Sequence, residues 1–181
     1  MANLSQFHIE ARSFGILGFA SHDYWALVDA NGDTIEELHG FATNPKTGEF
    51  VSLGSFGDEL WFYDHPMSIW LETDYRDSVD IYSGSESDVM AVWNKAVNLI
   101  PYLNSRHVPY TPLGTLSYPV WNSNSAYRLF GSAMGVSLHN ISGRWEPGID
   151  SDLVNADQVE ILSHWYNLPL RYLENPALNT F

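Results

Sequence analysis

Alternating apolar and polar residues predict β-structure over the first forty positions. An extended segment at 7–14 places its apolar side chains on one face. A second run, at 24–29, is rich in aromatic and β-branched residues, which favour a buried strand. Asn31-Gly32 follows this run and tolerates the positive φ of a tight turn. The sequence therefore predicts a β-hairpin whose second strand covers 34–39.

Beyond the hairpin, the apolar spacing changes from that of strands to that of a helix. Segments 50–53, 59–63 and 77–82 are predicted strands. One helical stripe follows Ser85, whose side chain suits a helix start, and Pro101 lies near its end. The members of the stripe are three or four residues apart or adjacent: Val89, Val92, Trp93, Ala96, Val97, Ile100 and Leu103.

A second helix is predicted at 122–134, where apolar residues line one face and Gly135 is a natural C-cap. A last short helix is expected at 152–162. Together these elements predict an α+β fold, an antiparallel sheet packed with helices. The 181 residues fit a single domain, with a core at about 7–135 and a C-terminal extension at about 136–181.

Composition narrows the classes of function. Hydrophobic residues make up 45% of the chain and aromatics 14%, which argues against intrinsic disorder. The formal net charge of −14 repels phosphate backbones and anionic lipid headgroups, so we expect neither nucleic acid nor a membrane surface as a partner. No apolar run approaches the length of a membrane span. The first residues lack the regions of a signal peptide. We therefore expect synthesis in the cytoplasm, with any export by a leaderless route.

Metal and thiol chemistry find little support in the sequence. The chain has no cysteine, which excludes disulfides, thiolate metal sites and a cysteine nucleophile in this chain as written. No histidine pair has the i, i+4 spacing of a helical zinc site. We expect no metal and no organic cofactor. His8, His65, His107, His139 and His164 belong to no recognisable constellation.

Polar residues gather at the start of the second predicted helix, in Asn122-Ser123-Asn124-Ser125. Such side chains commonly serve as helix caps. A nucleophile at this place would also face unpaired backbone N–H groups and the positive end of the helix dipole. Those groups can stabilise the oxyanion of an acyl-transfer intermediate. Ser123 is therefore both a candidate cap and a candidate nucleophile.

The order of these segments resembles the circularly permuted papain-like hydrolases. This superfamily includes the NlpC-related permuted group, the PPPDE isopeptidases and the lecithin:retinol acyltransferase relatives. Its members place a histidine at the start of an early strand, and their nucleophilic Cys follows an Asn at a later helix start. The resemblance rests on Ser21-His22-Asp23 and Asn122-Ser123-Asn124, and it covers roughly residues 7–135.

The resemblance assigns roles to three residues, and proximity to Ser123 adds three more candidates. Ser123 takes the nucleophile position and His22 that of the base. His39 lies where some members place a second polar partner. Oxyanion binding or lining of the site would fall to the neighbours of Ser123: Trp121, Asn122 and Asn124. Each of these side chains also has a purely structural interpretation as a cap, a core residue or a hydrogen-bonded surface group.

One departure from the family pattern is the Ser at the usual Cys position. A hydroxyl depends more heavily than a thiol on its base. Three explanations compete: a natural serine hydrolase, an inactive relative, and an exchange of Cys for Ser.

The expected activity is hydrolysis of an amide, or less readily of an ester, through a covalent acyl-enzyme. The resemblance implies a peptide or peptidoglycan-like substrate first, then an isopeptide bond, then a lipid ester. An exported antibacterial effector of this kind would have an immunity protein as partner. A non-catalytic binding module that retains the papain-like cleft is the alternative from a different class.

Overall fold

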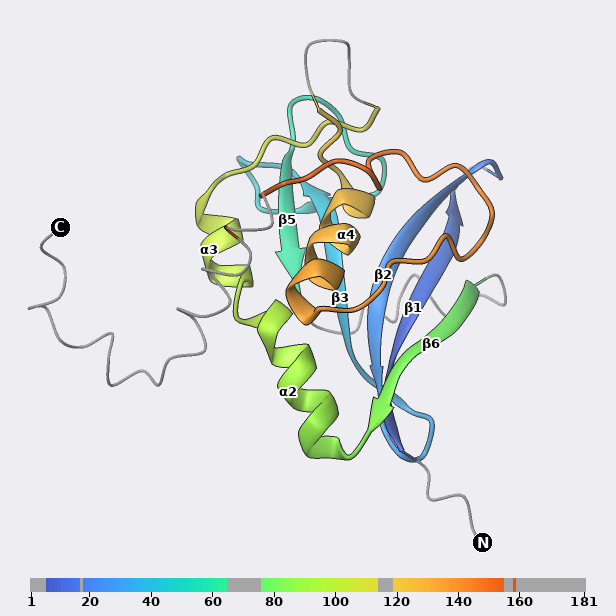
Figure 1. Cartoon of the computed structure of the whole chain (residues 1–181). Helices are drawn as coiled ribbons and strands as arrows, with labels where there is room; N and C mark the ends of the chain where they lie inside the picture. Colours follow the sequence, from blue (N-terminus) through green and yellow to red (C-terminus); the bar gives the residue numbers. More distant parts are fainter. Residues whose placement is uncertain (1–5, 17, 65–75, 114–118, 155–157, 159–181) are drawn as a thin grey trace, which may run out of the picture.

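The chain folds into an antiparallel sheet with helices packed on it, which confirms the predicted α+β class. The computed structural model describes residues 6–16, 18–64, 76–113, 119–154 and 158 (Figure 1). The helix expected at 152–162 lies mostly outside these residues. None of the described helices is long and apolar enough to cross a membrane.

The sheet is built around a meander of β1 (Phe7–Ile16), β2 (Ala20–Val28) and β3 (Thr34–Thr43). The predicted hairpin is confirmed, and Gly32 at its turn has φ +89°. Both strands of the hairpin extend beyond the predicted segments, because pairing with further strands continues past the aromatic run.

Three further strands complete the sheet. β6 (Arg76–Gly84) pairs with the outer edge of β1. β4 (Phe50–Val51) and β5 (Glu59–Tyr63) both pair with the last residues of β3. The strand order is β4-β3-β2-β1-β6, with β5 beside β3.

The long helical stripe of the sequence divides into two helices. α2 (Glu86–Val97) begins at Ser85, whose side chain accepts a hydrogen bond from Asp88 N. α3 (Ile100–Ser105) carries Pro101 in its first turn. Proline lacks an N–H group and its ring collides with the carbonyl four residues earlier, so one continuous helix is not formed. The prediction of a single helix was therefore wrong, although every stripe residue is helical or at a helix junction.

α4 (Ser123–Met134) agrees with the predicted second helix, and Gly135 ends it with φ 74°. α2 and α4 lie across one face of the sheet (Figure 1). The Trp25 indole stacks on Tyr127 of α4 and donates a hydrogen bond to the Tyr127 carbonyl at 2.8 Å. This face of β2 and β3 therefore forms the main core, and the opposite face carries the polar and aromatic side chains described next.

Candidate functional site

The site lies where β2 and β3 cease to pair. Their ladder ends at the Trp25–Leu38 pair, and His39–Thr43 of β3 pair with β5 instead. β1 occupies the other edge of β2 along its whole length. The backbone groups of Ser21 and Asp23 on the edge that β3 leaves must therefore find other partners.

Asn124 of α4 supplies most of those partners. Its Oδ1 accepts a hydrogen bond from Asp23 N at 3.0 Å, and its Nδ2 donates to the Ser21 carbonyl at 3.0 Å. Ser21 N donates to the Trp145 carbonyl at 3.2 Å. The Asn124 amide thus substitutes for a neighbouring strand on both sides of His22. In this way the start of α4 is fixed beside the first residues of β2.

Gly40 of β3 allows α4 to approach from the other side. A Cβ built at Gly40 would lie 2.3 Å from the Ala126 Cβ and 3.5 Å from the Ser123 Cα. Any side chain at this position would therefore displace the first turn of α4. The small residue is required here by close packing rather than by backbone conformation.

Asn122 is the N-cap of α4. Its Oδ1 accepts hydrogen bonds from Asn124 N and Ser125 N, and the Ser125 hydroxyl closes a capping box. Its Nδ2 donates to the carbonyls of Pro112 and Pro147. The N–H groups of Asn124 and Ser125 are therefore occupied and cannot bind an oxyanion. Of the N–H groups in the first turn of α4, the Ser123 N–H is the candidate donor to the oxyanion. Within the described chain, that N–H group has no hydrogen-bond partner.

His22 and Ser123 line the same cavity, which has a volume of about 220 Å³. Both residues are almost fully buried, with 6% and 7% of their surface exposed. The structure records no hydrogen bond between the Ser123 hydroxyl and either ring nitrogen of His22. The fold thus brings together two residues 101 positions apart, in an arrangement that still needs a closer approach before proton transfer.

His22 is held by a buried chain of hydrogen bonds. Its Nε2 lies 3.1 Å from His39 Nδ1, and His39 Nε2 lies 3.2 Å from Glu37 Oε2. A carboxylate only accepts hydrogen bonds, so Glu37 fixes the His39 proton on Nε2. With both imidazoles neutral, His22 then donates from Nε2 and retains an accepting Nδ1. We call His22, His39 and Glu37 the histidine chain.

Burial and the neighbouring His39 lower the pKa of His22 well below its ordinary value. A base with a lowered pKa is unprotonated at neutral pH and able to take up a proton. The ring is also held in place by stacking on Phe41, with 4.8 Å between centroids and 5° between planes. His39 stacks in the same way on Tyr24, at 4.6 Å.

Sequence reasoning missed Glu37 and Arg12. Glu37 lies two residues before His39, and this spacing puts both side chains on one face of a strand. Arg12 Nη1 lies 3.6 Å from Glu37 Oε1, and Arg12 Nε lies 2.6 Å from Glu10 Oε2. The spacing of Glu37 and His39, two positions apart on one predicted strand, was a usable signal for Glu37. Nothing local indicated Arg12, because it comes from a different strand.

Trp121 lies away from the cavity that contains Ser123. It lines a separate hollow with Phe62, Leu103, Arg106, Val108, Pro109, Leu153 and Val154. Its backbone N–H donates to the Thr111 hydroxyl at 2.6 Å. Trp121 therefore does not contact a ligand in the His22 cavity, although it directly precedes the N-cap. Its place next to Asn122 in the sequence suggested that Trp121 would line the same cavity as Ser123. The chain turns at Asn122 to enter α4, so the two side chains line different hollows.

Two buried carboxyl groups lie on the helix-covered side of the sheet. Burial raises the pKa of Asp23 to about 6, and the neighbouring Ser13 and Ser21 hydroxyls offset part of the increase. Burial and the charge of Asp23 raise the pKa of Glu146 to about 7. Both groups are thus costly to ionise at neutral pH.

No family model, no curated protein and no solved structure matches this chain. The assignment of a function therefore depends on the geometry of the cavity and of the histidine chain.

The close approach at Gly40 predicts a large effect of one added methyl group. Gly40→Ala should lower the free energy of unfolding by about 1–3 kcal/mol, because the start of α4 must move. Gly57→Ala is the matched control, since a Cβ there meets only the Ser55 hydroxyl at 3.9 Å. Denaturant titration measures both variants, and equal stabilities would contradict the proposed contact.

The raised pKa of the buried Asp23 carboxyl predicts that the free energy of unfolding depends on pH. Its folded pKa lies above its ordinary value of 3.8, so the native state binds this proton more tightly than the unfolded chain does. Its contribution to stability is therefore lost as pH rises from about 4 through about 6. Asp23→Asn should gain on the order of 2 kcal/mol relative to wild type between pH 4 and pH 8. Asp33→Asn, at an exposed turn, is the control substitution, and denaturant unfolding of both variants and of the wild type at each pH measures the difference.

Proposed function

We propose that this protein is an acyl-transfer hydrolase with a permuted papain-like arrangement of its site. The observation that carries the proposal is that Ser123, at the start of α4, and His22, on β2, line one cavity. An early strand that carries His22 and a later helix that begins at Ser123 are what the permuted order would require, and this supports the proposal. Apolar residues could fill the space of the buried histidine chain without loss of stability. The presence of polar residues there therefore supports a role in catalysis.

The proposed reaction begins with transfer of the Ser123 hydroxyl proton to His22 Nδ1. The Ser123 Oγ attacks the substrate carbonyl carbon, and the carbonyl oxygen becomes an oxyanion that the Ser123 N–H stabilises. The His22 imidazolium then gives its proton to the leaving group as the acyl–leaving group bond breaks. Water, activated by the same histidine, hydrolyses the acyl-enzyme and regenerates Ser123.

His39 and Glu37 have a supporting role in this mechanism. The His22 Nε2–H···Nδ1 His39 bond orients the ring so that Nδ1 is the basic nitrogen. The Glu37 carboxylate, two groups away, stabilises the positive charge that develops on the histidine chain. Asn124 and Gly40 contribute by fixing the position of Ser123 relative to His22.

The cavity favours an apolar acyl group. Among the residues that the structure describes, its lining contains no Asp, Glu, Lys or Arg side chain. Most of the lining residues are apolar: Phe14, Ile16, Phe41, Ala42, Phe50, Val51 and Leu53. A charged peptide stem would leave its ionic groups without partners in such a pocket. An aliphatic acyl ester or amide fits better than the peptidoglycan-like or isopeptide substrates, which remain the competing proposals. An immunity protein as partner belongs to the peptidoglycan proposal.

The second candidate is a binding module that retains the cleft without catalysis. The missing Ser123–His22 hydrogen bond favours this candidate, and so does the Ser in place of Cys. A module of this kind would bind the same apolar group but would form no covalent bond to Ser123.

A fluorophosphonate probe separates these candidates. An active enzyme should be labelled at Ser123, and His22→Ala should slow labelling by about a hundredfold or more. The rate in the wild type should stay level down to about pH 6.5 and fall only below it, because the pKa of His22 is lowered. His107→Ala is the control, since that histidine is exposed on the surface.

Mass spectrometry locates the label. Labelling at other residues, or equal labelling of the His22→Ala variant, would refute the catalytic pair. Strong activity that appears only in Ser123→Cys would identify an inactivated cysteine enzyme. Absence of labelling in both forms would favour the binding module.

The apolar lining predicts a preference for longer acyl chains. Among p-nitrophenyl esters, kcat/KM should rise from acetyl to hexanoyl by about tenfold or more, since each buried methylene contributes about 0.8 kcal/mol. Leu53→Ser should reduce this preference because Leu53 lines the cavity, whereas Leu113→Ser should not, although both leucines are similarly exposed. A preference for a charged stem peptide over every ester would contradict the assignment.

A further inference from the structure

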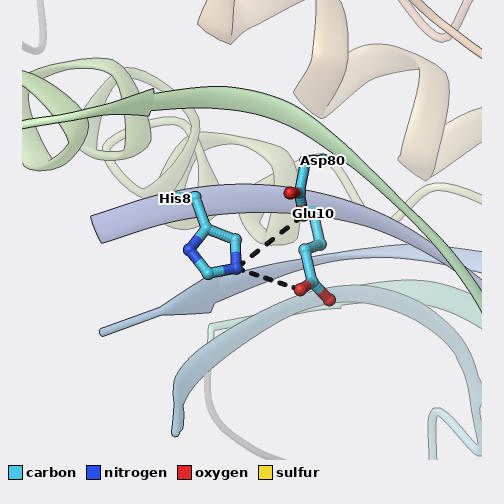
Figure 2. Close-up of side chains that lie close together, drawn as sticks. All are labelled: His8, Glu10 and Asp80. Carbon is cyan, nitrogen blue, oxygen red and sulfur yellow. Dashed lines mark hydrogen bonds and ion pairs between the residues drawn. The ribbon is translucent and has the colours of Figure 1, made fainter. Parts of the chain in front are cut away.

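A second cluster of ligand-type side chains lies at the opposite end of β1 from the cavity. Figure 2 shows His8, Glu10 and Asp80 directed toward one another. His8 Nε2 lies 3.0 Å from Glu10 Oε1 and 3.8 Å from Asp80 Oδ1. One ligand atom from each residue lies within 4.8 Å of the other two.

Sheet pairing creates this cluster. His8 and Glu10 are two residues apart on β1, so their side chains share a face. Asp80 of β6 is the cross-strand partner of Glu10, and a register shift between Ile9 and Glu10 brings the two strands out of regular alternation there. Asp80 lies 70 residues after Glu10 in the sequence, which explains why no metal motif was visible there.

The hydrogen bonding of His8 prepares it to bind a cation. Its Nδ1 lies 3.2 Å from the Gln6 carbonyl oxygen, which only accepts, so Nδ1 carries a proton. In the neutral ring Nε2 then has a lone pair, yet it faces two carboxylate oxygens. Three acceptors directed at one point require a proton or a metal ion between them. A backbone carbonyl on the far nitrogen is also the usual partner of a metal-bound histidine.

The surroundings of the cluster leave it accessible. Arg12 binds Glu10 Oε2 at 2.6 Å, which orients that carboxylate and leaves Oε1 directed at His8. The Asp80 side chain is 72% exposed, so it can adjust to an arriving ion from the solvent side. His8 and Glu10 are largely buried and already positioned.

We propose that His8 Nε2, Glu10 Oε1 and Asp80 Oδ1 form a site for one Zn²⁺ ion, with water at the remaining position. Tetrahedral zinc with ligands at about 2.0–2.2 Å places them about 3.3–3.6 Å from one another. The separations of 3.0 and 3.8 Å from His8 Nε2 bracket this value. One nitrogen and two oxygen ligands suit zinc better than Mg²⁺ or Ca²⁺, which prefer oxygen alone.

Isothermal titration of the chelator-treated full chain with ZnCl₂ tests the site. The wild type should bind one Zn²⁺, and both Asp80→Asn and His8→Asn should weaken binding by at least about tenfold. His107→Asn is the matched control, because His107 pairs with Glu59 at 3.1 Å but belongs to no three-residue cluster in the described chain. Thermal unfolding of each variant without metal checks that it folds.

Three outcomes would overturn the proposal. These are no binding by the wild type, equal binding by Asp80→Asn, and equal affinity for MgCl₂ or CaCl₂. A crystal soaked in ZnCl₂ gives an independent readout, since the anomalous peak should lie beside His8 Nε2. None of these three residues lines the His22 cavity, so failure here leaves the proposed hydrolase activity unaffected.

Discussion

The end of the β2–β3 ladder is the constraint on which the site depends. Past Trp25 and Leu38 the two strands take different partners, and β2 is left with an edge of unpaired backbone groups. Such groups are costly to bury without partners. The Asn124 amide satisfies two of them, the Asp23 N–H and the Ser21 carbonyl, and thereby fixes the start of α4 next to His22. One requirement of backbone hydrogen bonding thus explains why a helix terminus and a strand histidine meet at the same cavity.

The two faces of the sheet carry different kinds of side chain. The face under α2 and α4 carries the hydrophobic core, which includes Trp25, although the buried carboxyl of Asp23 also lies on this side. The opposite face carries a continuous series of ion pairs and hydrogen bonds from Glu10 through Arg12 and Glu37 to His39 and His22. A buried series of polar groups stabilises the fold only when each member has its hydrogen-bond partners. Loss of one member leaves its neighbours buried without a partner, which is costly. The proposed zinc ligands lie at one end of this series and the proposed base at the other.

Much of the fold was predictable because its signals are local. The Asn31-Gly32 turn, the Ser85 cap and the Gly135 terminus each act within a few residues, and all three are present in the structure. The break between α2 and α3 also has a local cause, because Pro101 prevents one continuous helix. The regular apolar spacing across the break led to the prediction of a single helix. The candidate site was only partly accessible in this way. Ser123 was visible as a helix start and the resemblance pointed to His39, whereas Glu37 behind His39 was missed.

By itself, the sequence determined the α+β class, the helix start at Asn122 and the types of residue available for chemistry. Tertiary structure alone decided which of those residues meet. It placed Ser123 and His22 at one cavity, moved Trp121 to another, and added Glu37 behind His39. The physical reason is that strand pairing and helix docking join positions tens of residues apart. Periodicity records which face a residue occupies but not which distant residue lies opposite it.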